Sequence, residues 1–152
     1  MPYAAQTKVP ISRTKTDIEE LLAKYGANGF GYVTEGNRAL VAFNMAGRRV
    51  QIMLAMPSID DYARTPRSAR RTAAARQSAW EQACRQRWRA LLLIIRAKLE
   101  AVESGITTLE SEFLANLVLP DGGTVGEWLA PQIAEAYGTG RMPPMLTSAT
   151  TG

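Results

Sequence analysis

The sequence contains no histidine and one cysteine, Cys84, among its 152 residues. The absence of histidine excludes the usual histidine-dependent catalytic dyads and triads, and with a single cysteine it also excludes the usual zinc sites. One cysteine forms no intrachain disulfide, which is typical of proteins in a reducing cytosol. The longest strictly apolar run, residues 90–95, is far too short to cross a membrane, and the N-terminus has no apolar export signal. We therefore expect a cytoplasmic protein with no membrane partner.

Charged residues are distributed unevenly along the chain. The net charge is only +4, but residues 64–99 contain ten cations and one acid, Glu81, whereas residues 100–152 contain seven acids and one cation, Arg141. Such an asymmetry predicts either a surface that binds a polyanion or two faces that pair with each other, within the fold or across a dimer.

Residues suited to catalysis are scarce. Asp60 and Asp61 are adjacent acids that would need Asp17 or Glu20 to complete a magnesium site, and acids in a polar loop are more often solvated. The Gly122–Thr124 turn could offer backbone N–H groups to a phosphate, but it lacks the lysine and the spacing of a P-loop. The sequence therefore favours a binding protein over an enzyme, with no metal and no cofactor.

The N-terminal half predicts a helix followed by a small sheet. Residues 1–13, which contain two prolines, are predicted to form an extended arm. A helix follows, with Thr16 as its N-cap, acids in its first turn and Gly26 at its end. From Gly29 to Met56 apolar residues alternate in three short runs separated by turns, which predicts an antiparallel meander with one buried face.

A long helix is predicted from Ser68 to Gly105. At 100° per residue, seven of its apolar side chains fall on one stripe: Trp80, Cys84, Trp88, Leu91, Ile95, Leu99 and Val102. Because Leu92, Leu93 and Ile94 widen this apolar surface, we expect that part of the helix to be covered on several sides.

Two shorter helices are predicted after the long one. Thr107 precedes Glu110 by three residues and Thr124 precedes Glu127 by three, and both spacings are typical of a capping box. Trp128 falls on the apolar face of the second helix, so we expect it to pack in the core, as we do Trp80 and Trp88, rather than to stack on bases.

The predicted fold is α+β: a helix, a three-stranded antiparallel meander, a long central helix and two short C-terminal helices, packed on one side of the sheet. The length suits one domain, over residues 14–138, between the arm of residues 1–13 and a tail of residues 139–152.

The segment Arg87–Pro144 resembles small hypothetical proteins encoded by bacteriophages and prophages. The similarity rests on four motifs: RWRA at 87–90, AKLEAV at 97–102, LPDG at 119–122 and GEWLAPQ at 126–132. This resemblance implies a bacterial host cell and accessory work there, either handling nucleic acid or blocking a host defence. It implies no particular mechanism.

The order of elements is also similar to that of double-stranded RNA-binding domains. In those domains a basic motif at the start of the second helix contacts phosphates across a groove. The segment Ser68–Ala73, which contains Arg70 and Arg71, stands at that point here. Ala74 replaces the last cation of the motif, which removes one phosphate contact.

Arginines are the candidate binding residues. Residues 64–76 contain five of them and no acid, and precede the densely apolar part of the helix, so we expect this cluster to face a partner. Arg48 and Arg49 follow a hairpin turn, where cations are commonly presented to a polyanion. The candidate residues for binding nucleic acid or another anion are Arg48, Arg49, Arg67, Arg70, Arg71, Arg76, Arg85 and Arg89. In the alternative interpretation, the aliphatic parts of the helix arginines cover the rim of the hydrophobic core, and their guanidinium groups pair with acids of the C-terminal helices.

Our leading hypothesis is a non-catalytic accessory protein of phage type that binds nucleic acid or another polyanion through its basic central helix. One alternative is an anti-defence inhibitor that binds a host defence protein or sequesters a small nucleotide in a pocket. Another is a structural homo-oligomer in which the basic helix meets the acidic C-terminal helices.

Overall fold

The first helix begins earlier than its sequence signals predict. The computed structural model describes residues 4–142, and in it α1 spans Ile11–Lys24. Pro10 precedes the helix, where its missing N–H is not needed, and no side chain caps this end. The predicted N-cap, Thr16, lies inside the helix and donates its hydroxyl to the Ser12 carbonyl. The prediction of an extended arm is therefore wrong for residues 11–13, whereas the predicted end at Gly26, which has φ +89°, is confirmed.

The predicted three-stranded meander is confirmed. β1 (Asn28–Glu35), β2 (Arg38–Met45) and β3 (Arg48–Ala55) form one antiparallel sheet in the order β1-β2-β3. On β2, Val41 and Phe43 are buried and pair with Ile52 and Val50 of β3. Alternation along the strands thus turns one face of the sheet toward the core.

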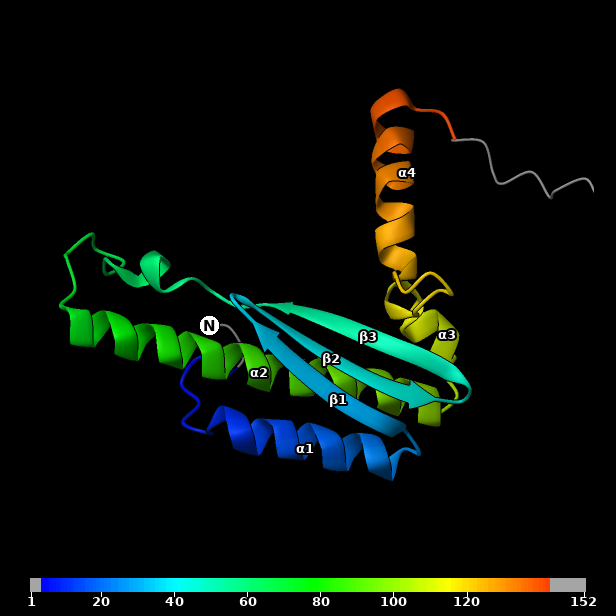
Figure 1. Ribbon diagram of the computed structural model, residues 1–152, viewed down its shortest axis with the longest axis horizontal. Helices are drawn as coiled ribbons and strands as arrows, with labels where there is room; N and C mark the ends of the chain where they lie inside the picture. Colours follow the sequence, from blue (N-terminus) through cyan, green and yellow to red (C-terminus); the bar gives the residue numbers. More distant parts are fainter. Residues whose placement is uncertain (1–3, 143–152) are drawn as a thin grey trace, which may run out of the picture.

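The long helix, α2, spans Ala73–Glu103, so its 31 residues extend about 46 Å. It begins five residues after the predicted Ser68, because Ser68 has φ +65° and Arg64 and Arg70 pair across a small hairpin. The Thr72 hydroxyl then caps the helix by accepting the Ala75 N–H. Figure 1 shows the N-terminal part of α2 extending past the end of the sheet.

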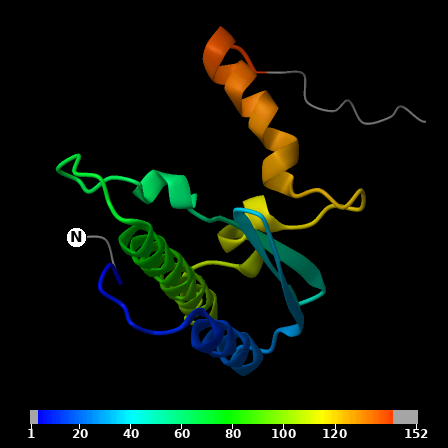
Figure 2. The same cartoon turned by 60° about the vertical axis from the view of Figure 1, so that its left-hand side comes forward.

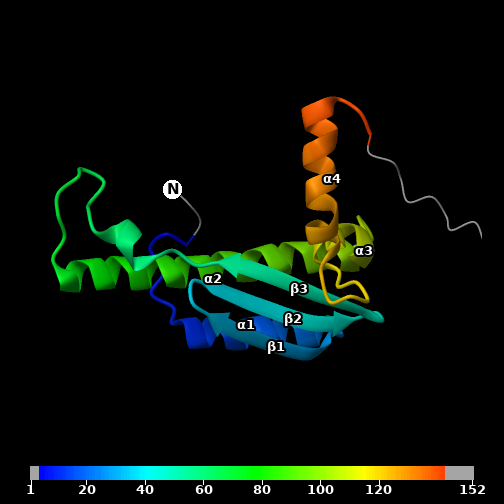
Figure 3. The ribbon, with the colours of Figure 1, turned by 45° about the horizontal axis from the view of Figure 1, so that its top comes forward.

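The core lies between the sheet and the helices α1 and α2, which run side by side on the same face of the sheet (Figures 2 and 3). The buried side chains of α2 follow most of the predicted stripe: Cys84, Trp88, Leu91, Leu92, Ile95 and Leu99. Leu93 and Ile94 are exposed, so the prediction of cover on several sides is wrong there. Both stay accessible because α1 and the sheet cover only part of this helix, and Leu93 lines an open groove beside α1.

A short helix, α3 (Leu109–Glu112), and a 3-10 turn, η2 (Leu114–Asn116), follow α2. The capping residue of α3 is Thr108, whose hydroxyl accepts the Ser111 N–H, and not the predicted Thr107. Phe113 completes the core, with its ring edge-on to Phe43 at a centroid distance of 5.7 Å.

The last helix, α4 (Val125–Thr139), stands apart from the sheet (Figure 1). Its predicted capping box, Thr124 with Glu127, is confirmed, and the helix continues through Pro131. α4 has no buried residue, and Trp128 is 47% exposed, so the prediction that Trp128 packs in the core is wrong. The reason is that α4 packs mainly on η2, and its first turn contacts residues 115–117. Most of the predicted tail, residues 143–152, lies outside the described residues.

Candidate nucleic-acid interface

A basic loop, held in shape by hydrogen bonds within it, connects the sheet to α2. After the 3-10 turn η1 (Ile59–Tyr62), the chain forms a hairpin in which the Thr65 N–H donates to the Ala69 carbonyl at 2.8 Å. The Arg64 guanidinium donates to the Ser68 carbonyl at 2.9 Å. The Arg71 guanidinium donates to the carbonyls of Tyr62 and Arg64, at 3.2 and 2.9 Å. Two arginines therefore fix the loop through backbone carbonyls and keep their positive charge.

We call Arg64, Arg67, Arg70, Arg71 and Arg76 the basic end of α2. Within residues 4–142, none of these five guanidinium groups forms a salt bridge. Arg67 and Arg70 are exposed and make no side-chain hydrogen bond with any described residue. The Nε atom of Arg76 is buried and has no hydrogen-bond partner there. The structure thus gathers four of the predicted site residues, with Arg64, in one place.

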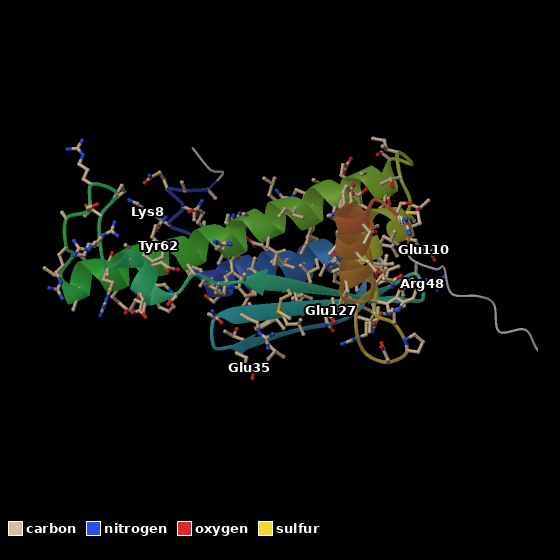
Figure 4. All side chains as sticks on the ribbon, turned by 90° about the horizontal axis from the view of Figure 1, so that it is seen from above. Lys8, Glu35, Arg48, Tyr62, Glu110 and Glu127 are labelled. Atoms are coloured by element: carbon tan, nitrogen blue, oxygen red, sulfur yellow. The ribbon has the colours of Figure 1, made fainter. Side chains whose placement is uncertain are left out.

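Arg48 and Arg49 lie at the opposite end of the molecule. The Arg48 guanidinium forms a salt bridge with Glu110 at 2.7 Å, and the two residues are neighbours in Figure 4, far from Tyr62 beside the basic end. Arg49 donates to the side-chain carbonyl of Asn44 at 3.3 Å. These two arginines therefore do not extend the surface of the basic end, although sequence reasoning grouped them with it.

Arg85 and Arg89 of α2 have partners within the fold. The Arg89 guanidinium donates to the Asp17 carboxylate of α1 at 2.8 Å, with both side chains largely buried. This hydrogen bond holds the pKa of Asp17 below its usual value, with a smaller contribution from the charge of Arg13. Arg85 donates to the side-chain oxygen of Gln82 at 2.6 Å. Arg89 is therefore neutralised within the fold.

Within residues 4–142, two cations form salt bridges with acids of the C-terminal part. Besides Arg48 with Glu110, Lys98 contacts the Glu112 carboxylate at 3.5 Å and donates to the Glu112 backbone carbonyl at 2.8 Å. Cations near α3 thus pair with the protein's own acids, as one interpretation of the sequence predicted. The basic end has no such pairs among the described residues and is compatible with the other interpretation, in which its arginines bind an external polyanion. Local charge counting could not separate the two interpretations, because the acid partners lie 14 and 62 residues away in the chain.

The weaker candidate sites have ordinary structural roles. Asp61 accepts the Ser58 N–H in a capping box of η1, and among the described residues no group of three acidic or cysteine side chains is placed to hold a metal ion. The Gly123 N–H donates to the Asp121 carboxylate at 3.0 Å, and Glu127 completes the cap of α4. Because two carboxylates already occupy this turn, it repels a phosphate.

Sequence reasoning missed Lys15 and misjudged the surroundings of Trp80. Lys15 lies on α1 with its ammonium group 4.2 Å from the centroid of the Tyr32 ring. Trp80 is half-buried at the side of a cavity rather than in the core. The late predicted start of the first helix placed Lys15 outside the helix, so its position relative to the aromatic residues had no sequence signal.

No helix among residues 4–142 combines the length and apolar character needed to span a membrane. Comparisons of the chain with known protein families, with curated proteins and with solved structures gave no match. The arrangement of charges and cavities described above is therefore the basis on which function is assigned.

Proposed function

We propose that the protein binds nucleic acid through the basic end of α2. The observation that carries the proposal is the contrast between two groups of cations in one chain. Arg48, Arg89 and Lys98 have carboxylate partners, whereas the five arginines of the basic end have none within the described residues.

The loop geometry supports this proposal. Arg64 and Arg71 are held by backbone carbonyls, which fixes their direction without neutralising them. Arg67, at the hairpin, and Arg70, just before the helix cap, are exposed beside them. A cluster of fixed and exposed guanidinium groups suits phosphates, because each contact releases condensed counterions and adds affinity.

The position of the basic end also favours a long polyanion over a small one. It lies at the part of α2 that extends past the sheet, beside η1 (Figure 3). Nearby acids are Asp60 and Asp61 on η1, and neither forms a salt bridge with the basic end.

Two matched double variants test the proposal. Fluorescence anisotropy with labelled duplex RNA, duplex DNA and single strands measures affinity for wild type, for Arg67→Gln with Arg70→Gln, and for Arg48→Gln with Arg49→Gln. Both variants remove two positive charges, but we expect only the first to lose most of its affinity. Equal losses from both variants, or no binding by wild type at low salt, would show that the proposal is wrong.

We propose as a second function that α4 forms a homodimer. α4 is amphipathic, yet Trp128, Ile133 and Tyr137 are 47, 52 and 88% exposed. A 15-residue helix that contains Pro131 is marginal in water without packing, since isolated helices of that length are barely stable and an interior proline removes a hydrogen bond.

Charge favours a second copy of this chain as the partner. Glu127 lies in the first turn of α4 and Arg141 lies just beyond its end. In an antiparallel pair of α4 helices, Arg141 of one copy approaches Glu127 of the other, and the two helix dipoles oppose each other favourably.

Light scattering coupled to gel filtration tests the dimer. We expect a dimer for wild type and a monomer for Trp128→Ser with Ile133→Ser. The control is Val33→Ser with Met53→Ser, which removes exposed apolar side chains from the outer face of the sheet and leaves the dimer intact. A monomeric wild type, or a dimer that only the control disrupts, would contradict this assignment.

A further inference from the structure

An apolar cavity of about 730 Å³ lies between the start of α1, the N-terminal half of α2, the β1–β2 turn and the segment after β3. Its volume is within the range of small-molecule binding sites. The residues that matter for its chemistry are Ile11, Lys15, Met56, Trp80, Cys84 and Trp88. None of the five arginines of the basic end lines it.

The aromatic walls of this cavity are fixed in place. The Trp80 indole N–H donates to the Pro57 carbonyl at 2.7 Å, which sets the orientation of its ring. Trp88 is only 2% exposed, and its ring meets Tyr32 edge-on at 6.5 Å. Because Trp80 is half-buried and its ring is held in place, it offers a preformed surface against which a flat ligand can pack, beside the buried Trp88.

One cation at the cavity has no anionic partner. The Lys15 ammonium lies 4.2 Å from the Tyr32 ring centroid and 5.1 Å from that of Trp88, and it forms no salt bridge with any carboxylate of residues 4–142. Glu81, the one acid that lines the cavity, accepts a hydrogen bond from Gln77 at 2.9 Å instead. Lys15 is half-buried, and a positive charge held beside aromatic rings without a carboxylate partner attracts an anionic group.

We propose that this cavity binds a small molecule with one planar aromatic ring system and one anionic group. The ring packs against the half-buried Trp80, and the anion pairs with Lys15. Arg85, which also lines the cavity and has only the neutral Gln82 as a side-chain partner, adds positive charge at its edge. An aromatic carboxylate and a mononucleotide share this chemistry.

Isothermal titration calorimetry with three probes tests the proposal: 2-naphthoate, its neutral counterpart 2-naphthamide, and AMP. Binding of 2-naphthoate alone identifies aromatic carboxylates as the ligand class, and binding of AMP alone identifies mononucleotides. Either result supports the proposal, and binding of neither anion overturns it.

A matched pair of lysine variants on α1 then locates the anion. We expect Lys15→Gln to weaken binding of the anionic probe by about tenfold or more, because a hydrogen-bonded charge contributes at least that much, and to leave 2-naphthamide unchanged. Lys15→Arg restores the charge and most of the affinity. Lys24→Gln is the control, since Lys24 also lies over an aromatic ring, at 6.0 Å from Tyr25, but outside the cavity.

A further variant tests whether the cavity binds its ligand independently of the proposed nucleic-acid surface. Replacing Arg67 and Arg70 by glutamine is expected to leave the dissociation constant of the anionic probe unchanged. If Lys24→Gln weakens the anion as much as Lys15→Gln does, or if Lys15→Gln weakens 2-naphthamide equally, the assignment of the anion to Lys15 is overturned.

Discussion

Replacing Arg67 and Arg70 by glutamine removes two exposed cations and leaves the hydrogen bonds of Arg64 and Arg71 inside the loop intact. The expected effect on nucleic-acid binding follows from counterion release, in which the logarithm of the binding constant falls by about 0.9 per phosphate contact for each tenfold rise in salt. If each of the five arginines contacts one phosphate of a duplex, the slope for wild type is about −4.5. The double variant retains three contacts, so its slope is about −2.7.

These slopes correspond to large differences in affinity. Between about 50 and about 200 mM salt, wild type is expected to lose roughly 500-fold in affinity and the variant roughly 40-fold. Anisotropy titrations of a labelled duplex of about 20 base pairs across this range measure both slopes. Equal slopes for the two proteins, or a wild-type slope near zero, would refute the reasoning, because the basic end would then carry no phosphate contacts.

Three further outcomes test the fold. Gly126→Ala is expected to destabilise the first turn of α4, because its added Cβ would lie 2.9 Å from the Ala115 carbonyl oxygen. Gly138→Ala, whose Cβ meets nothing within 4 Å, should instead raise the stability of α4 by about 0.5–1 kcal/mol. Thermal unfolding and helix content, both measured by circular dichroism, compare the two variants. Phe113→Ala removes a fully buried ring and is expected to lower the free energy of unfolding in urea by about 3–5 kcal/mol. Arg89 lowers the pKa of Asp17 in the folded protein relative to the unfolded chain, where it is about 3.9. The ionised Asp17 therefore stabilises the fold fully at pH values above about 3.9. This stabilisation is lost as the pH falls through the lower pKa of the folded state. The stability difference between wild type and Asp17→Asn should therefore shrink toward pH 2.5 in urea titrations; a difference that grows on acidification would contradict the assignment.

Local periodicity was sufficient to predict the sheet and the buried side of α2. Alternation along β2 and β3 sets which side chains face the core, and a shift of one residue would turn Val41 and Phe43 outward. The α2 stripe from Cys84 to Leu99 was likewise predictable, since burial of one side requires the helical period.

Helix starts and the position of α4 were not predictable in the same way. Thr16 and Pro10 both carry signals for a helix start, and the apolar contact of Ile11 with the core favours the earlier one. An amphipathic pattern shows that a helix has an apolar face but not which surface covers it. Trp128 therefore looked like a core residue, although α4 packs mainly on η2 and leaves Trp128 exposed.

The candidate site depended on contacts between distant parts of the chain. Asp17 and Arg89 are separated by 72 residues and Arg48 and Glu110 by 62, so no local pattern could show which arginines were neutralised. Only the cluster of residues 64–76 could be recognised in advance, because it contains no acid and its cations are close neighbours in the sequence.

Mapping amide chemical-shift changes by NMR when a short nucleic-acid duplex is added tests the central claim most directly. The account predicts that the largest changes fall on residues 63–76, with small changes at Arg48, Arg49 and α3. Changes centred on the β2–β3 turn or on α4, with residues 63–76 unaffected, would contradict the claim that the basic end of α2 is the binding surface.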